Sequence, residues 1–178
     1  EFAMLRCGFR SYGNGILNTD SSFDTFAKDA IKNNIKIGAY FFSSAITKQE
    51  AIEEADYVLD IIKPYKITYP VVIAFEEISG DSYRQENLTT EELTDIIIAF
   101  CDKIEKAGYK PMIYSNLKGF VGRLDLTRLE KYEKWFAYYS DTPYFPYEFS
   151  IWQYTESAKL DGVSGNTIDL NISFKDYN

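Results

Sequence analysis

The sequence predicts an α/β fold: an irregular, TIM-like (β/α) barrel with fewer helices in its C-terminal half, or an open parallel sheet. Four apolar runs, each typical of a strand, are followed by segments whose apolar residues recur at helical spacing. Parallel neighbours in a sheet need such helical crossovers. The later strands then follow one another without a long helix between them. The length of 178 residues fits one domain, so we expect residues 1–178 to form a single domain.

The first two units occupy the N-terminal third of the chain. Residues 2–9 are expected to form a strand, and apolar residues at helical spacing between 23 and 31 form its helix. Residues 36–42 predict the second strand. Thr47 and Glu50 have the spacing of a capping box, which starts a helix that ends near Pro64. Because chain termini usually lie at the surface, a strand that opens at residue 2 suggests that something upstream is missing.

The third unit holds the clearest signals. Residues 69–75 predict a buried strand, and Thr89 and Glu92 form a second capping box before a helix that ends near Gly108. The remaining elements are expected as strands at 110–115, 134–139 and 148–154, a short helix at 126–132, and a glycine-punctuated strand pair or hairpin at 162–174.

Composition excludes several classes of function. With 27 acidic and 19 basic residues the formal net charge is −8, which argues against nucleic acid as a partner. The absence of histidine excludes a Ser-His-Asp triad, a Cys-His dyad and histidine-based zinc sites. Cys7 and Cys101 are expected to be buried free thiols rather than a disulfide or metal site. No uncharged apolar run is long enough for membrane insertion, and nothing implies a cofactor.

Glu76 is the first candidate for chemistry, because it follows a buried strand where catalytic groups of α/β folds gather. It should face the same way as Ala74, two residues earlier, while Glu77 faces away and is structural. In a partly apolar pocket such a carboxyl group can act as a general acid. The alternative is a helix-capping or ion-paired glutamate. Asp169, in another apolar run, is either a site acid or a turn residue near Gly165 and Asn166.

Aromatic residues near predicted strand ends form a second group of candidates. A single one is more often core than ligand platform, but several around one rim favour a stacking cleft. They are Tyr40, Tyr114, Tyr138 and the run Trp152-Gln153-Tyr154. Arg6 on the first strand should meet a carboxylate within the barrel, since a buried unpaired charge is costly. Asp20 is expected to be a turn or N-cap residue.

Taken in order, these segments resemble glycoside hydrolase family 25, the Chalaropsis-type lysozymes that cleave the bond between muramic acid and glucosamine in bacterial peptidoglycan. The resemblance runs over essentially the whole chain. It is carried by segments 4–9, 37–42, 54–57, 109–116, 135–138, 151–154 and 161–171. Each motif is weak alone, and the ordered set is specific.

The resemblance implies a role for each candidate residue. The family's catalytic strand ends in Asp-x-Glu, which falls here on Ala74-Phe75-Glu76. Glu76 would be the general acid, and position 74 is that of a lost aspartate that stabilises the developing positive charge or the attacking acetamide of the substrate. Asp169 would match the acid of the last strand. The substrate-binding wall would comprise Tyr40, Tyr114, Tyr138, Trp152 and Gln153.

Two departures from the family shape the functional hypothesis. Alanine at 74 removes a charge whose loss commonly lowers the rate by a factor of about 10²–10³, and the family's first strand with its Asp-x-Ser is absent. We therefore expect an inactivated muramidase that binds peptidoglycan strands. The alternatives are a non-catalytic glycan-binding domain and a structural module of a wall-associated protein. The substrate implies an extracellular or cell-wall location, with further wall-binding domains outside the chain.

Overall fold

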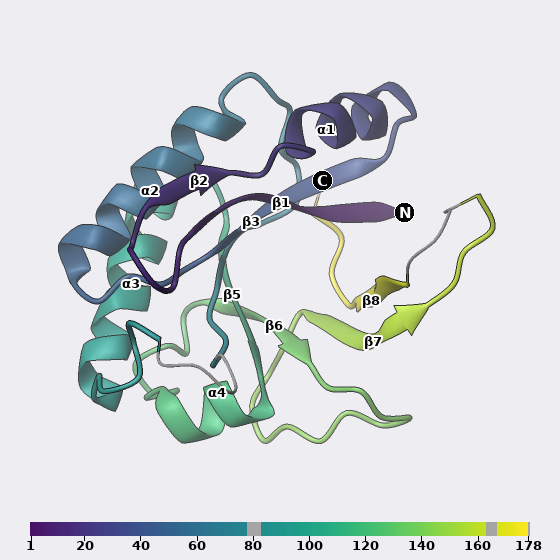
Figure 1. Cartoon of the computed structure of the whole chain (residues 1–178). Helices are drawn as coiled ribbons and strands as arrows, with labels where there is room; N and C mark the ends of the chain where they lie inside the picture. Colours follow the sequence, from purple (N-terminus) through teal and green to yellow (C-terminus); the bar gives the residue numbers. More distant parts are fainter. Residues whose placement is uncertain (78–82, 163–166, 178) are drawn as a thin grey trace.

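The computed structural model describes residues 1–77, 83–162 and 167–177, and its eight strands form one curled sheet (Figure 1). The strand order is β2-β1-β3-β4-β5-β6-β7-β8; β2 and β8 are antiparallel to their neighbours, and the other pairs are parallel. The strands are β1 (Phe2–Arg10), β2 (Leu17–Thr19), β3 (Lys36–Phe42), β4 (Val71–Ala74), β5 (Pro111–Asn116), β6 (Glu133–Ala137), β7 (Ile151–Ala158) and β8 (Ile168–Ser173). The helices are α1 (Phe23–Lys32), α2 (Lys48–Ile62), α3 (Thr90–Lys106) and α4 (Leu117–Arg123).

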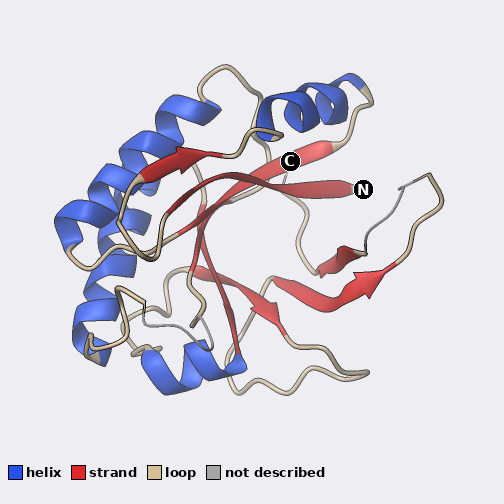
Figure 2. Cartoon of the chain, viewed as in Figure 1, coloured by secondary structure: helices blue, strands red, loops and turns tan. Residues whose placement is uncertain are grey.

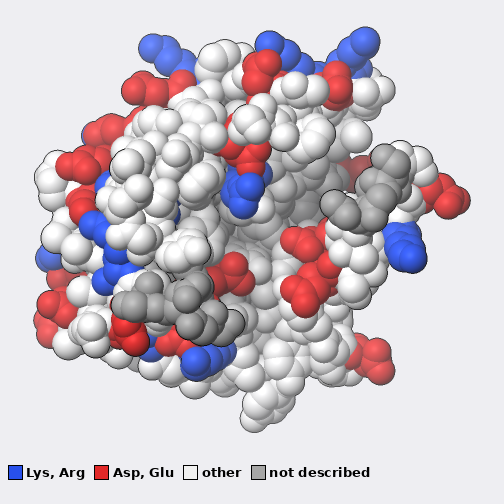
Figure 3. Space-filling view, viewed as in Figure 1, with Lys and Arg blue, Asp and Glu red and all other residues white. Residues whose placement is uncertain are grey.

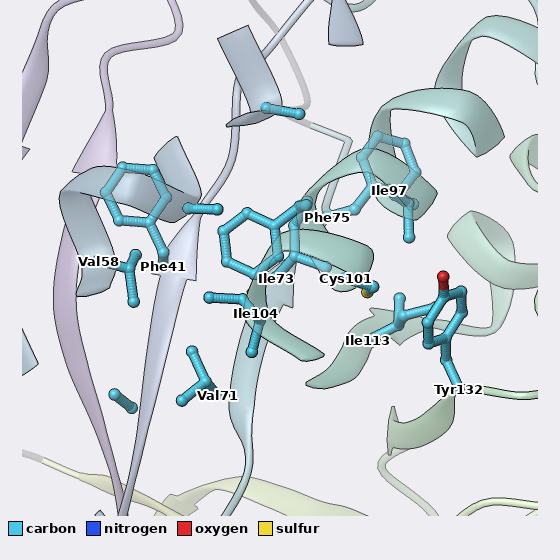
Figure 4. Close-up of a cluster of buried hydrophobic side chains, with 14 of the residues drawn as sticks. Phe41, Val58, Val71, Ile73, Phe75, Ile97, Cys101, Ile104, Ile113 and Tyr132 are labelled. Carbon is cyan, nitrogen blue, oxygen red and sulfur yellow. The ribbon is translucent and has the colours of Figure 1, made fainter. Parts of the chain in front are cut away.

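The predicted α/β class is confirmed, and the helices cover only one face of the sheet (Figure 2). We call this the helix face and the opposite, concave side the pocket face. Side chains that point to the helix face join an apolar core with α2 and α3 (Figure 4). Val71, Ile73 and Phe75 belong to that core, whereas Val72 and Ala74 pack in a second cluster on the pocket face. The alternation of side chains along β4 therefore directs Glu76 to the pocket face.

A β-bulge in β1 changes which face its side chains point to. Arg6 lies opposite Tyr40, but Gly8 lies opposite Phe41, so Cys7 is the extra residue. A Cβ atom on Gly8 would lie 2.5 Å from the carbonyl oxygen of Asn18, which explains glycine where β2 approaches. Arg6 consequently points to the pocket face and Arg10 to the helix face. Neither the bulge nor β2 is signalled by the sequence.

Both predicted capping sites start helices. Thr89 and Glu92 form the complete capping box at α3. Thr47 caps α2 by accepting a hydrogen bond from the Glu50 backbone N–H, but the Glu50 carboxylate instead accepts from the Ile46 N–H. Cys7 and Cys101 are buried free thiols, as predicted.

The C-terminal half departs from the prediction in two places. The short helix is α4, capped by Asn116, and not residues 126–132, which form turns. Gly119 and Gly122 within α4 weaken its helical signal in the sequence. The end of the chain is a single strand, β8, that pairs with β7, rather than a self-contained hairpin. Residues 163–166, including Gly165 and Asn166, lie outside the described residues, as do Ile78 and Ser79, which follow β4 and Glu76.

The described part of the sheet is curled but open, so it does not establish the predicted TIM-like barrel. A groove of about 450 Å³ lies between β1 and β8 and is lined by residues of both strands, including Phe2, Met4 and Asp169. The eight strands of this curled, open sheet form a mixed α/β half-barrel. Within the described residues, no helix is long and apolar enough to cross a membrane.

Candidate active site

A pocket of about 240 Å³ opens on the pocket face where the parallel strands end. It brings together six of the eight residues predicted to form the site: Tyr40, Ala74, Glu76, Tyr114, Gln153 and Asp169. They come from β3, β4, β5, β7 and β8, so segments more than 100 residues apart in the sequence meet here. Figure 3 shows a hollow on this side of the molecule with acidic side chains around it and a basic one at its rim.

The backbone that carries Glu76 is fixed from both sides. The Ser43 N–H donates to the Ala74 carbonyl at 2.9 Å, and the Phe75 N–H donates to the Tyr114 carbonyl at 3.0 Å. The Ser115 hydroxyl donates to the Phe75 carbonyl at 2.7 Å. These bonds hold the end of β4 rigidly between its two neighbours, so the Glu76 carboxyl group is held against Tyr114.

Burial raises the pKa of Glu76, and the nearby carboxylates of Asp169 and Glu156 raise it further, against a lowering hydrogen bond from Tyr114. Burial and Glu156 likewise raise the pKa of Asp169. A raised pKa shifts a carboxyl group toward its protonated form. The site can therefore hold one protonated carboxyl group beside another acid, the arrangement needed for general acid catalysis.

Gln153 connects the two acids through a hydrogen-bond network. Its side-chain oxygen accepts from the hydroxyls of Tyr114 at 2.9 Å and Tyr139 at 2.8 Å, and its amide nitrogen donates to Asp169 at 3.2 Å. The Tyr114 hydroxyl lies 3.3 Å from Glu76 and has one proton to give. It therefore divides its donation between the Gln153 side-chain oxygen and the Glu76 carboxyl group.

Aromatic rings form the floor of the pocket. Trp135 meets Tyr114 and Tyr40 edge-on, with ring centroids 4.7 and 5.7 Å apart, and its indole N–H donates to Asn171 at 2.7 Å. This packing leaves Trp135 only 3% exposed. The rings thus present an apolar surface beside the acids, and the Trp135 ring is held in place on both sides.

Two predicted residues lie elsewhere. Tyr138 stacks on Phe136, and Trp152 donates its indole N–H to the Tyr138 carbonyl, both on the helix face. The sequence does not show this orientation, because β6 is buried on both faces and the polar Gln153 of β7 is itself buried, so polarity does not tell which residues point into the pocket. Trp135 and Tyr139, one step out of phase with Tyr138, point to the pocket side instead. In the sequence Trp135 stands out only as part of the segment 135–138, and no pattern singles out Tyr139 or Glu156.

Several acid predictions are met in the structure. Glu77 points away from the pocket and pairs with Arg123 at 2.7 Å and with Lys118, as expected for a structural residue. Asp20 accepts the Ser22 N–H in a turn and is also the carboxylate that pairs with Arg6. Among the described residues, no group of three or more His, Cys, Asp or Glu side chains is placed to hold a metal ion.

The sequence profile of Glycosyl hydrolases family 25 matches residues 10–163. A D-alanyl-L-alanine endopeptidase of Streptococcus phage B30 is 31% identical over 152 residues, which span 75% of this chain and 32% of the phage protein. The Clostridium perfringens spore cortex lytic enzyme SleM is 29% identical, with a TM-score of 0.81 over 97% of this chain and 59% of that one. The modular autolysin LytC of Streptococcus pneumoniae, solved with a synthetic peptidoglycan ligand, shares the fold at 22% identity and a TM-score of 0.78, over 93% of this chain and 39% of that one. The chain thus spans between 32% and 59% of the length of these relatives.

Proposed function

We propose that this chain, which belongs to Glycosyl hydrolases family 25, acts on the glycan strands of peptidoglycan with Glu76 as its general acid. The observation that carries the proposal is the shared pocket of Ala74, Glu76 and Asp169 at the ends of β4 and β8. The bond it would cleave joins N-acetylmuramic acid to N-acetylglucosamine. Action at the cell wall, as one catalytic domain beside further wall-binding domains, is part of the same proposal.

Each acid has a defined task in this reaction. Glu76 gives its proton to the glycosidic oxygen as the bond from that oxygen to C1 of the muramic acid breaks. The acetamide oxygen of the same sugar attacks C1, and Asp169, held by Gln153, stabilises the positive charge that develops. Water then opens the cyclic intermediate at C1, and the Glu76 carboxylate takes the proton that the water loses, which restores the starting state.

In the family's Asp-x-Glu pattern position 74 is an aspartate, so alanine there leaves the pocket without that negative charge. We therefore propose that the chain binds glycan but cleaves it slowly, and Ala74 equally favours the alternative of a non-catalytic glycan-binding domain. We also propose how the barrel would be completed. A further strand in the groove between β1 and β8 would pair with the open edges of these two strands and complete an irregular barrel.

The experiment compares the protein, Ala74→Asp, and Ala74→Asp with Glu76→Gln on purified Gram-positive cell walls. Release of reducing ends measures cleavage, and sedimentation with the walls measures binding. We expect Ala74→Asp to raise the cleavage rate by about 10²–10³, and the added Glu76→Gln to return it to background while binding persists. A folded Ala74→Asp variant that binds walls without cleaving them would establish the binding-domain alternative. If the protein neither binds nor cleaves the walls, both the hydrolase and the binding-domain functions are contradicted.

A further inference from the structure

Arg6 lies at the rim of the candidate active site, and most of its guanidinium donors are not used by the described residues. Its Nε donates to Asp20 at 2.7 Å, and its side chain is 49% exposed. Within the described part of the chain, its two terminal Nη groups donate to no protein atom. Asp20 therefore fixes the direction of the side chain while the end of the guanidinium fork stays open. Such a fork matches a carboxylate with two parallel hydrogen bonds.

A groove of about 520 Å³ begins at Arg6 and continues away from the pocket. Arg6 and Phe42 line both spaces, so the groove and the pocket are contiguous. Phe9, which lies 5.6 Å below the Arg6 guanidinium, and Tyr12 give the groove an aromatic wall. Among the described residues, no acidic side chain lines it, whereas Glu76 and Asp169 line the pocket. The change in charge from pocket to groove favours a ligand that is neutral at one end and anionic at the other.

The second arginine of the groove is not available to a ligand. Arg10 donates to Glu54, to the carbonyls of Gly15 and Glu50, and to Glu53, and its side chain is 6% exposed. It fixes the turn that forms the far wall of the groove. Arg6 is thus the group through which the groove would recognise an anion.

We propose that Arg6 and this groove form a subsite for a carboxylate attached to the sugar in the pocket, which lets the protein distinguish muramyl glycans from glycans of N-acetylglucosamine alone. The inference rests on the proposed function. Muramic acid differs from glucosamine by a lactyl ether at O3, whose carboxylate is either free or bonded to a peptide that carries its own carboxylate. Both sources present the same chemistry to Arg6.

The test measures binding of four tetrasaccharides by calorimetry. Three contain alternating N-acetylglucosamine and N-acetylmuramic acid, with the lactyl carboxylates free, converted to neutral methylamides, or joined to L-Ala-D-Glu. The fourth is chitotetraose, which has no lactyl group. We expect the protein to bind at least one carboxylate form more tightly than the methylamide. Tighter binding of the free acid identifies the lactyl group as the source, and tighter binding of the dipeptide form identifies the peptide.

Arg6→Gln should weaken binding of the preferred carboxylate form by about tenfold or more and leave the methylamide and chitotetraose unchanged. Arg128→Gln is the matched control: it removes the same charge, but Arg128 pairs with Asp95 at the start of α3. Arg6→Lys keeps the charge without the fork and should recover only part of the affinity.

Equal binding of the acid and methylamide forms, or an equal effect of Arg6→Gln on all probes, would overturn the subsite and leave the glycan-binding function standing. If no tetrasaccharide binds and the walls do not retain the protein, the proposed function fails with the subsite. The two failures are therefore distinguishable.

Discussion

Arg6 and Arg10 lie four residues apart on β1, each paired with a carboxylate, yet their surroundings are opposite. Arg10 meets Glu54 at 2.8 Å between the sheet and α2, and the Glu54 side chain is fully buried. Ser43 donates to the second oxygen of Glu54 at 2.6 Å, so this ion pair is saturated. Arg6 meets Asp20 at the edge of an open groove, and its Nη groups remain available as donors. The first pair holds the fold together, and the second is available for recognition.

The bulge at Cys7 causes the difference. In a regular strand residues 6 and 10 point the same way, and both arginines would face one side. The extra residue reverses the alternation after Arg6, which sends Arg10 to the helix face. Residue type alone does not set the role of a charge; the depth of its burial and the number of its partners do.

The largest expected effect concerns the buried pair. Glu54→Ala should lower the free energy of unfolding by about 3–5 kcal/mol, because it leaves the Arg10 charge buried without its main partner. The neighbouring Glu53→Ala is the control: Glu53 contacts the same arginine at 3.4 Å but is 48% exposed, so about 1 kcal/mol or less is expected. Urea denaturation measures both, and equal losses would refute the contrast.

The pH dependence of stability gives the next largest effect. Burial raises the pKa of Glu54 to about 7, against lowering hydrogen bonds from Ser43 and Arg10. A carboxyl group whose pKa is raised on folding stabilises the fold fully below its unfolded pKa, and that contribution is lost as pH rises through about 7. The stability of the protein relative to Glu54→Gln should therefore fall between pH 5 and pH 8, by at most about 3 kcal/mol. A difference that stays constant with pH would exclude Glu54 as the titrating group.

On the pocket face the network around Gln153 should respond more modestly. Gln153→Leu removes the acceptor of Tyr114 and Tyr139 and should lower the free energy of unfolding by about 1–3 kcal/mol. The freed Tyr114 hydroxyl then donates to Glu76, so the pKa of Glu76 should fall. Tyr114→Phe should have the opposite effect and raise that pKa. Carbon-13 NMR titration of the Glu76 carboxyl group measures both shifts, and shifts of the same sign would contradict the network.

The smallest effect is expected at the exposed arginine. Arg6→Gln should change the free energy of unfolding by about 1 kcal/mol or less, since its ion pair and its contact with Phe9 are both open to water. Arg10→Gln, the same substitution on the other face, should cost several times more. Thermal and urea unfolding of the two variants would compare them directly, and similar losses would remove the distinction between the pairs.

Much of the fold follows from local sequence signals. The capping threonines, the helical spacing along α3 and the apolar run of β4 each depend on neighbours within one turn or one strand, so the sequence predicts them well. The elements it missed, β2 and α4, are short and exist through their contacts. β2 is three residues long and pairs only with the end of β1, and α4 contains two glycines.

The sequence by itself determined the α/β class, the exclusion of histidine chemistry, and Glu76 at a strand tip beside an alanine. Only the tertiary structure decided which aromatic rings face the pocket, because β6 is buried on both sides and the polar Gln153 of β7 is itself buried, so polarity does not reveal orientation. It also decided the partners of each charge. Gln153 meets Asp169 and Arg10 meets Glu54 across 16 and 44 residues of sequence, and such distances close only when the sheet is assembled.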